Sequence, residues 1–195
     1  MIKIIHRVNE IEKLLNLDQG YGVEIDLHAF GERLVVNHDA FQDGPNFSTW
    51  LKSCRNRFVI FNIKEEGIEN RVIGMALENG VEDFFLLDLS FPALVKMIHN
   101  GEKRLAIRVS EYESIENALC FTKKIDWVWL DCFEGFPLNV KDFNLLKGAG
   151  FKICLVSPEL HGPHRTTNEI VDMQEFIKIQ DLTVDAVCTK YPEIW

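Results

Sequence analysis

The stretch Gly22-Val23-Glu24-Ile25-Asp26-Leu27 has the alternation of polar and apolar residues that is typical of a β-strand. Alternate side chains of a strand lie on the same face, so Glu24 and Asp26 point one way and their apolar neighbours point the other way. Two adjacent carboxylates repel each other, and burying them without partners is costly. A bound hard divalent cation such as Mg²⁺ or Ca²⁺ would remove that cost. The strand therefore predicts a cation site.

A second apolar stretch, Leu34-Val35-Val36-Asn37-His38-Asp39, follows shortly afterwards. The sequence Phe30-Gly31-Glu32-Arg33 between the two stretches is typical of a hairpin turn. Such a hairpin brings His38 back towards the acidic strand, and His6 ends the first apolar run of the chain. Two carboxylates and two histidines at the ends of apolar strands indicate a metal-assisted acid–base site.

The whole chain alternates between apolar, β-rich runs and segments with helical periodicity. The predicted strands are Ile2–His6, Val23–His28, Phe58–Lys64, Phe84–Asp88, Leu105–Ser110, Trp127–Asp131, Lys152–Ser157 and Ala186–Lys190. The predicted helices are Glu10–Leu17, Phe47–Leu51, Glu69–Glu78, Ala93–His99, Ser114–Lys123, Lys141–Lys147 and Asn168–Lys178. This alternation favours a parallel sheet with crossover helices, and eight repeats favour a closed (β/α)8 TIM barrel of the α/β class. A β-hairpin is expected after its second strand.

Local signals support these boundaries. Gly80, Gly101 and Gly150 follow three of the predicted helices, where a C-terminus favours glycine. Ser90 with Pro92 marks the start of another helix.

Each predicted strand begins apolar and ends polar. If the polar positions face inward, they gather at the C-terminal mouth of the barrel, where barrel enzymes have their active sites. One such residue alone is equally well explained as the start of a loop, but the complete set is harder to explain in that way. The set comprises His6, Glu24, Asp26, His28, Asn62, Lys64, Asp88, Arg108, Ser110, Asp131, Ser157 and Lys190.

Length and composition limit the class of protein. The 195 residues predict a single domain over residues 1–195, and the hydrophobic content of 47% is sufficient for a core. A formal net charge of −9 without a basic run makes nucleic acid or an anionic membrane an unexpected partner. We see no signal peptide and no membrane-spanning run. The five cysteines are scattered, which suggests free thiols in a reducing cytoplasm. The sequence does not indicate an oligomeric state.

The ordered motifs resemble those of the glycerophosphodiester phosphodiesterases, a (β/α)8-barrel family related to phosphatidylinositol-type phospholipases. The chain has His6-Arg7 where the family has a His-Arg pair ending its first strand, and Glu24-Ile25-Asp26 where it has Glu-x-Asp. It has His38-Asp39 for the His-Asp pair after the hairpin, and Thr189-Lys190-Tyr191-Pro192 is similar to the family's Thr-Asp-x-Pro. The order and spacing of the motifs match those of the family from residue 2 to about residue 64, and a weaker similarity follows near the C-terminus.

The resemblance implies a phosphoric diester hydrolase that acts on a small glycerophosphodiester-like substrate with a divalent cation. A cation neutralises the phosphodiester and orients the attacking group, while two histidines divide the proton transfers. The residues expected in these roles are His6 and His38 as acid and base, Arg7 and Lys64 on the phosphate, and Glu24, Asp26 and Asn62 on the cation. Further residues expected at the mouth are Asp88, Arg108, Asp131 and Lys190.

Four positions depart from the family pattern. Val8 and Asn9 follow His-Arg where the family has glycine, Asn62 replaces a glutamate that ligates the metal, and Lys190 replaces an aspartate. An asparagine supplies a carbonyl oxygen without charge, so a weaker site or the use of Asp88 or Asp131 is an alternative.

Two other functions are compatible with the sequence. A phosphodiester lyase that forms a cyclic phosphate would use the same residues. A non-catalytic barrel that binds a phosphorylated ligand is the other, and Asn62 and Lys190 favour it. The alternative to a cation site at Glu24 and Asp26 is a set of structural ion pairs with Arg7, Lys64 or Arg108.

Overall fold

The computed structural model describes residues 1–54 and 56–195. Its strands are β1 (Ile2–Ile5), β2 (Gly22–Phe30), β3 (Arg33–Val36), β4 (Val59–Ile63), β5 (Phe84–Leu87), β6 (Ala106–Val109), β7 (Trp127–Leu130), β8 (Lys152–Val156) and β9 (Ala186–Thr189). Its helices are α1 (Ile11–Leu15), α2 (Phe47–Ser53), α3 (Glu69–Glu78), α4 (Phe91–His99), α5 (Ile115–Leu119), α6 (Val140–Gly148), η1 (Pro158–His161) and α7 (Thr167–Ile179).

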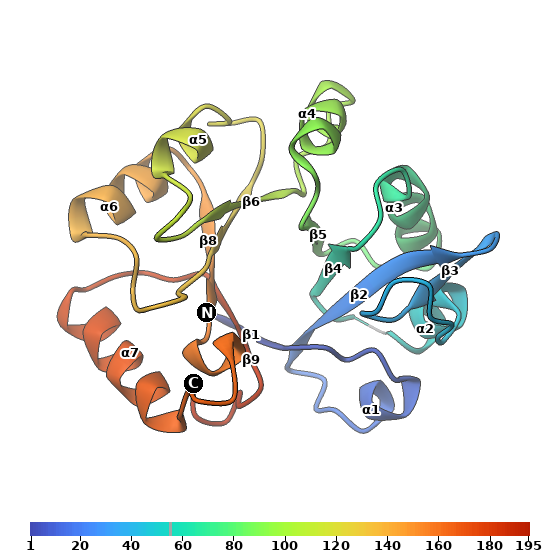
Figure 1. Ribbon diagram of the computed structural model, residues 1–195, viewed down its shortest axis with the longest axis horizontal. Coiled ribbons are helices and arrows are strands. Elements are labelled where there is room, and N and C mark those ends of the chain that lie inside the picture. Colours follow the sequence, from blue (N-terminus) through green and yellow to red (C-terminus); the bar gives the residue numbers. More distant parts are fainter. Residues whose placement is uncertain (55) are drawn as a thin grey trace. The chain divides into compact units, whose positions relative to one another are not determined.

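The strand order identifies the fold. Within one sheet the order is β5-β4-β2-β1-β9-β8-β7-β6, and β3 pairs with β2 outside this path (Figure 1). With β3 set aside, each strand lies beside the strand that precedes or follows it in the chain, and the pairs β1–β2, β2–β4 and β6–β7 are parallel. This is the topology of an eight-stranded (β/α)8 barrel, so the predicted fold class is confirmed.

Most boundaries differ from the prediction by one or a few residues. The predicted strands that included Ser110 and Asp131 end at Val109 and Leu130, so both polar residues directly follow their strands. The predicted helix Ser114–Lys123 is shorter, Ile115–Leu119, and Lys123 has a left-handed φ of +64° that a helix cannot contain.

The helix-end signals are confirmed. Gly80, Gly101 and Gly150 have φ values of +75°, +84° and +95°, which glycine adopts without steric cost. The Ser90 side chain accepts a hydrogen bond from the N–H of Ala93 and caps α4.

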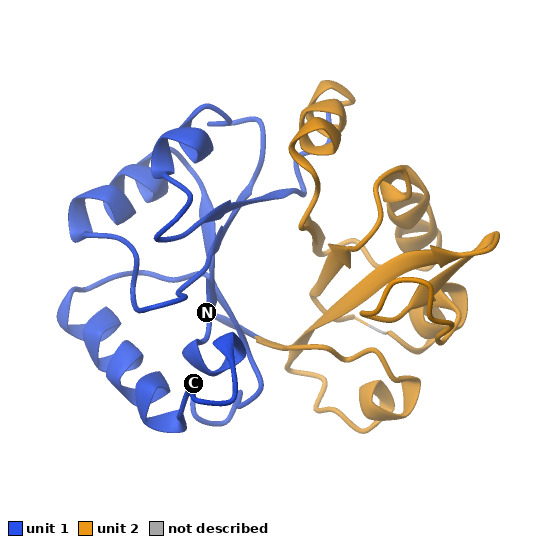
Figure 2. Ribbon diagram, viewed as in Figure 1, with its two compact units in different colours: residues 1–3, 101–195 blue, residues 4–100 orange. Residues whose placement is uncertain are grey.

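The contacts between residues cluster into two compact units, which Figure 2 shows in different colours. Unit 1 comprises residues 1–3 and 101–195, and unit 2 comprises residues 4–100.

In unit 2, side chains along β2 and β4 point alternately to an apolar face and to a polar face of the sheet. Strands β2 and β4 are parallel, with Asp26 opposite Asn62. Phe61 lies on the other face of β4, where its ring contacts Phe47 of α2 at a centroid distance of 5.6 Å and Phe84 of β5 at 5.2 Å. Phe61 is fully buried, and its replacement by alanine would cost about 3–5 kcal/mol. Because neighbouring side chains alternate, Asn62 and Asp26 point away from this aromatic cluster.

The predicted hairpin of unit 2 is confirmed. Strands β2 and β3 are antiparallel, and Phe30 pairs with Arg33 across the two-residue loop Gly31-Glu32. Gly31 has a φ of +60°, as the first residue of a tight hairpin turn requires. The register places Leu27 opposite Val36, so the residues that follow β3 return to the middle of β2.

Unit 1 contains β6 to β9 with α5, α6 and α7, and its strands are also paired in parallel. Its core includes the buried residues Trp129, Leu130 and Leu155. Helix α7 begins with a capping box, in which Thr166 and Glu169 exchange side-chain and backbone hydrogen bonds.

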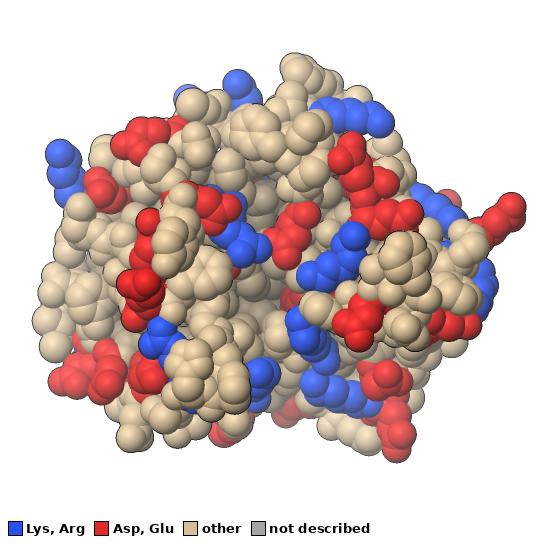
Figure 3. All heavy atoms as spheres, in the orientation of Figure 1, with Lys and Arg blue, Asp and Glu red and all other residues tan. Residues whose placement is uncertain are grey.

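Basic and acidic side chains are interspersed over the face drawn in Figure 3. Among the described residues, no helix is both long enough and apolar enough to cross a membrane.

Candidate functional site

Most of the predicted site residues of unit 2 lie in β2 and β4 or directly after β1, β4 and β5. Ile5 is paired with Val23, so His6 follows β1 next to Glu24. Asp26 is opposite Asn62 in the β2–β4 ladder, and the backbone N–H of Lys64 donates to the carbonyl of Leu27. Equal parity therefore puts these polar side chains on one face of the sheet, as the sequence predicted.

Glu24 is a buried carboxylate without a strong counter-charge. Its Oε2 accepts a hydrogen bond from the Arg7 backbone N–H at 2.8 Å, and its Oε1 accepts one from Asn62 Nδ2 at 3.0 Å. Burial and the charge of Asp26 raise the pKa of Glu24 to about 7, although these hydrogen bonds and Lys64 lower it. The ionised form of Glu24 is thus poorly stabilised by the protein itself.

Asp26 is also fully buried but has charged partners. Arg7 Nε lies 3.5 Å from Oδ2, and Lys64 Nζ lies 3.3 Å from Oδ1. Asn9 donates from Nδ2 to Oδ2 at 3.0 Å, and its own Oδ1 accepts from the Asp26 N–H at 3.1 Å. These two bonds fix both the backbone and the carboxylate of Asp26. Asp26 therefore has the ion pairs with Arg7 and Lys64 that the sequence offered as an alternative to a cation site. Arg7 contacts Glu24 through its backbone N–H.

Hydrogen bonds hold residues 7–9 alongside β2. The Val8 N–H donates to the Glu24 carbonyl at 2.8 Å, and Trp50 Nε1 donates to the Val8 carbonyl at 3.0 Å. Arg7 has a left-handed φ of +52°, a conformation that costs a non-glycine residue on the order of 1 kcal/mol. The segment thus positions the groups that contact both carboxylates.

The two predicted catalytic histidines have different surroundings. His6 Nε2 lies 3.9 Å from Glu24 Oε2, and its side chain is 17% exposed. His38 is 41% exposed, and its Nδ1 lies 2.8 Å from Asp39 Oδ1. The preceding residue, Asn37, donates its N–H to the Asp26 carbonyl at 3.0 Å. His38 therefore lies one residue from a direct contact with the acidic strand, and it is the Nδ1 atom of His38 that contacts Asp39.

Asp88 joins this group through Lys64. Lys64 Nζ lies 3.7 Å from Asp88 Oδ2, so the ammonium group stands between Asp26 and Asp88. Asp88 has a φ of +60°, which aspartate tolerates better than most residues. Of the further mouth residues, Asp88 belongs to unit 2, whereas Arg108, Asp131 and Lys190 belong to unit 1.

The donor atoms of unit 2 fit a hard divalent cation. Glu24 and Asp26 supply carboxylate oxygens, and Asn62 Oδ1 is buried without a hydrogen-bond partner among the described residues. Asp26 Oδ1 likewise has its ion pair with Lys64 but no hydrogen bond there. In the described part of the chain no three His, Cys, Asp or Glu side chains are grouped to hold a metal. A cation here would thus need the amide oxygen of Asn62, a ligand type that suits Mg²⁺ or Ca²⁺.

In unit 1, polar residues surround two buried carboxylates, those of Asp131 and Glu159. Asp131 Oδ2 accepts a hydrogen bond from Arg108 at 2.7 Å, and Asp131 Oδ1 lies 2.9 Å from His161 Nε2. The His161 ring packs on Phe133 with a centroid distance of 4.7 Å. Buried Asp131 therefore has a basic side chain on each oxygen.

Glu159 is the second buried carboxylate of unit 1, and it is surrounded by hydrogen-bond donors. Its carboxylate accepts hydrogen bonds from the Ser157 hydroxyl, from Thr189 Oγ1 at 2.6 Å and from the Lys190 N–H at 2.8 Å. The side chain of Lys190 is exposed. The predicted strand-end residues Ser157 and Lys190 thus serve to satisfy a buried carboxylate.

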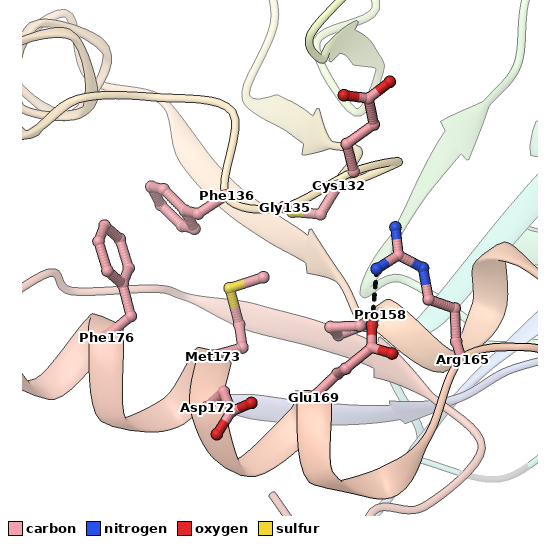
Figure 4. A pocket seen from close by; sticks show the side chains of 10 residues that line it. Cys132, Gly135, Phe136, Pro158, Arg165, Glu169, Asp172, Met173 and Phe176 are labelled. Atoms are coloured by element: carbon pink, nitrogen blue, oxygen red, sulfur yellow. Dashed lines mark hydrogen bonds and ion pairs between the residues drawn. The ribbon is translucent and has the colours of Figure 1, made fainter.

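Unit 1 also has a hollow of about 390 Å³ between the segment after β7 and helix α7. Figure 4 shows Phe136 and Phe176 at one end and the Arg165–Glu169 ion pair at the other, with Met173 between them. None of the residues predicted to be catalytic, phosphate-binding or metal-binding lines this hollow.

Sequence reasoning missed two residues that organise these sites. Asn9 was noted only as a departure from a glycine-rich pattern, yet it makes two hydrogen bonds to Asp26. Glu159 is not among the expected site residues, although its place two positions after the end of a predicted strand is a similar signal.

Comparison with solved structures finds the same fold. The chain is similar to glycerophosphodiester phosphodiesterase from Agrobacterium tumefaciens, with a TM-score of 0.69, 14% identity, and coverage of 100% of this chain and 99% of that one. It is also similar to a glycerophosphoryl diester phosphodiesterase from Parabacteroides distasonis, with a TM-score of 0.68, 10% identity, and coverage of 99% and 84%. At these identities the likeness establishes the fold, which is that of the family the sequence motifs resemble.

Sequence comparison adds nothing to this result. No protein-family profile and no curated protein sequence matches the chain.

Proposed function

We propose that this protein is a divalent-cation-dependent phosphodiesterase that hydrolyses a small glycerophosphodiester-like substrate. The observation that carries the proposal is the arrangement at Glu24. This buried carboxylate has a pKa raised to about 7, lies 3.9 Å from His6 Nε2, and is hydrogen-bonded to Asn62, whose Oδ1 has no hydrogen-bond partner among the described residues. Such a group is expected to take up a cation.

Glu24, Asp26 and Asn62 would hold the cation, which supplies charge neutralisation at a phosphodiester oxygen and activation of the attacking hydroxyl or water. The Asn9 side chain bonds to Asp26 and the Arg7 N–H bonds to Glu24, so protein groups already orient the two carboxylates. The ligand geometry would thus be formed before substrate arrives.

His6 and His38 would transfer the protons. His6, which lies close to Glu24, would exchange a proton with one oxygen of the phosphodiester. His38, whose Nδ1 contacts Asp39, would exchange a proton with a second oxygen through Nε2. Proton transfer by a positioned side chain contributes about 10²–10⁴-fold to a rate. Arg7 and Lys64 would hold nonbridging phosphate oxygens, which Arg7 can do through two parallel hydrogen bonds.

A second function has one observation in its favour. Asp26 is already paired with Arg7 and Lys64, so a barrel that binds a phosphorylated ligand without catalysis is compatible with its surroundings. A lyase that forms a cyclic phosphate would use the same residues as the hydrolase.

The test is an assay of glycerophosphodiesters with Mg²⁺ or Ca²⁺, repeated with excess chelator, with the products followed by phosphorus NMR. The proposal predicts a phosphomonoester product whose formation stops with the chelator. A persistent cyclic phosphate would indicate the lyase, and binding of the phosphodiester without turnover would indicate the non-catalytic barrel.

A further inference from the structure

Asp26 is the point at which the candidate cation ligands meet the candidate phosphate-binding side chains. Its Oδ1 lies 3.3 Å from Lys64 Nζ, and its Oδ2 lies 3.5 Å from Arg7 Nε. The two side chains proposed to hold the phosphate are therefore directed at a proposed cation ligand. A cation and a phosphodiester would each have to change these ion pairs.

The carboxylate of Asp26 is buried and hydrogen-bonded, whereas the two basic side chains are partly exposed. Asp26 is fully buried and is held by two hydrogen bonds to Asn9, at 3.0 and 3.1 Å. The side chains of Arg7 and Lys64 are 47% and 21% exposed, so both have solvent on one side and room to turn towards a ligand. Lys64 also has a second acidic partner, Asp88 Oδ2 at 3.7 Å, when it leaves Asp26.

Either ligand alone meets an electrostatic obstacle. A dication on Asp26 would stand close to the ammonium of Lys64, and like charges at such distances repel strongly away from bulk water. A phosphodiester that drew Lys64 and Arg7 away from Asp26 would leave a buried carboxylate without compensation, which is strongly unfavourable. When both ligands bind, the cation compensates Asp26 and the phosphodiester compensates the two basic side chains, so neither obstacle remains.

We infer that the divalent cation and the phosphodiester bind cooperatively at this site, through exchange of the Asp26 ion pairs with Lys64 and Arg7. This inference rests on the proposed function, because it concerns the same cation and the same anion. Cooperativity between two ligands is reciprocal, so each must raise the affinity for the other by the same factor.

The test is isothermal titration calorimetry on the full chain with Mg²⁺ and dimethyl phosphate, a phosphodiester without a glycerol group. Mg²⁺ is titrated with and without saturating dimethyl phosphate, and dimethyl phosphate with and without saturating Mg²⁺. We expect each ligand to tighten the other by about fivefold or more, with equal factors in the two directions. Equal affinities with and without the other ligand would overturn the inference.

Lys64→Met separates this exchange from a purely structural role of Lys64. Removal of the ammonium abolishes the repulsion, so Mg²⁺ alone should bind more tightly than to the wild type, and the effect of dimethyl phosphate on Mg²⁺ affinity should shrink. A structural role would instead weaken Mg²⁺ binding. Lys52→Met, at an exposed position of α2 in the same unit, is the matched control and should behave as the wild type.

Arg7→Gln provides the second variant in case Lys64→Met does not fold, since Arg7 is nearly half exposed and its backbone N–H bond to Glu24 is retained. It should reduce the coupling factor while Mg²⁺ alone still binds, and an undiminished factor would contradict the inference. A wild type that binds neither ligand would overturn the proposed function as well. A wild type that binds both independently would overturn only the coupling.

Discussion

The buried carboxylates of the two units differ in how their charge is compensated. In unit 1, Asp131 lies between Arg108 and His161, and Glu159 accepts hydrogen bonds from two hydroxyl groups and a backbone N–H. In unit 2, Glu24 and Asp26 are two positions apart on one strand face, and burial next to Asp26 raises the pKa of Glu24 to about 7. Unit 1 therefore places basic side chains or hydrogen-bond donors at its buried acids, whereas in unit 2 the charge of Glu24 is less well compensated.

This difference shows which strand-end residues indicate a ligand site. A polar side chain at the end of a barrel strand serves structure when neighbouring groups complete its hydrogen bonds, as at Glu159. We interpret a buried unused acceptor as a ligand signal where it lies beside a poorly compensated carboxylate, as Asn62 Oδ1 does beside Glu24.

The largest effect is expected from the histidines of unit 2. His6→Ala and His38→Ala should each lower kcat by about 10²–10⁴-fold, because each removes a proposed proton-transfer group. His161→Ala, which breaks the Asp131 pair of unit 1, should leave kcat within the same order of magnitude. Steady-state kinetics on the three variants checks this, with circular dichroism to verify that each is folded. An equal loss in all three variants would remove the distinction between the units.

The carboxylate of Glu159 should be required for stability. Glu159→Ala leaves the Ser157 and Thr189 hydroxyls and the Lys190 N–H without their acceptor, which should lower the free energy of unfolding by about 3 kcal/mol. Urea unfolding followed by tryptophan fluorescence measures the change. A loss well below 1 kcal/mol would mean that these groups find other partners.

The metal-free protein should become less stable as the pH rises. The folded state keeps the proton of Glu24 up to about pH 7, whereas the unfolded chain releases it near the ordinary glutamate pKa of 4.5. The native state thus binds more protons in this window, and the free energy of unfolding should fall by about 2 kcal/mol from pH 5 to pH 7. Urea unfolding in the presence of chelator at several pH values measures this slope.

Glu24→Gln is the matched variant for the pH experiment. It removes the titrating group and should flatten the slope, so that at pH 7 and above the variant is more stable than the metal-free wild type. An identical slope in the variant would assign the pH dependence to another group.

The smallest effect is expected at Asn9. Asn9→Ala removes both hydrogen bonds that orient Asp26 and should weaken Mg²⁺ binding by about tenfold or more, as is usual when a residue that orients a metal ligand is lost. Calorimetry measures the affinity, and Asn70→Ala, at an exposed position of α3, serves as the control. Unchanged affinity in Asn9→Ala would mean that Arg7 and Lys64 suffice to hold Asp26.

Much of this arrangement could be predicted from the sequence because it depends on periodicity. Alternation along β2 gives the shared face of Glu24 and Asp26, and Gly31 gives the hairpin that returns the chain to that strand. These features depend on residues that are close in the sequence. The repeated alternation of strands and helices then predicts the fold of the whole chain.

The compensation of each charge could not be predicted, because it depends on contacts between distant segments and on the conformation of loops. Lys64 meets Asp26 across 38 positions, and Arg7 needs a left-handed φ of +52° to be placed between the two acids. Thr189 reaches Glu159 across 30 positions. Differences of less than an ångström decide such contacts, and no sequence pattern specifies them.

We predict that unit 2 binds a divalent cation at Glu24, Asp26 and Asn62. The most direct test is anomalous diffraction from crystals soaked with Mn²⁺, which accepts the same oxygen ligands as Mg²⁺. We predict an anomalous peak within coordination distance of oxygen atoms from all three side chains, which Glu24→Gln removes or weakens. A peak elsewhere, or none at a Mn²⁺ concentration that saturates the protein in solution, would contradict the account.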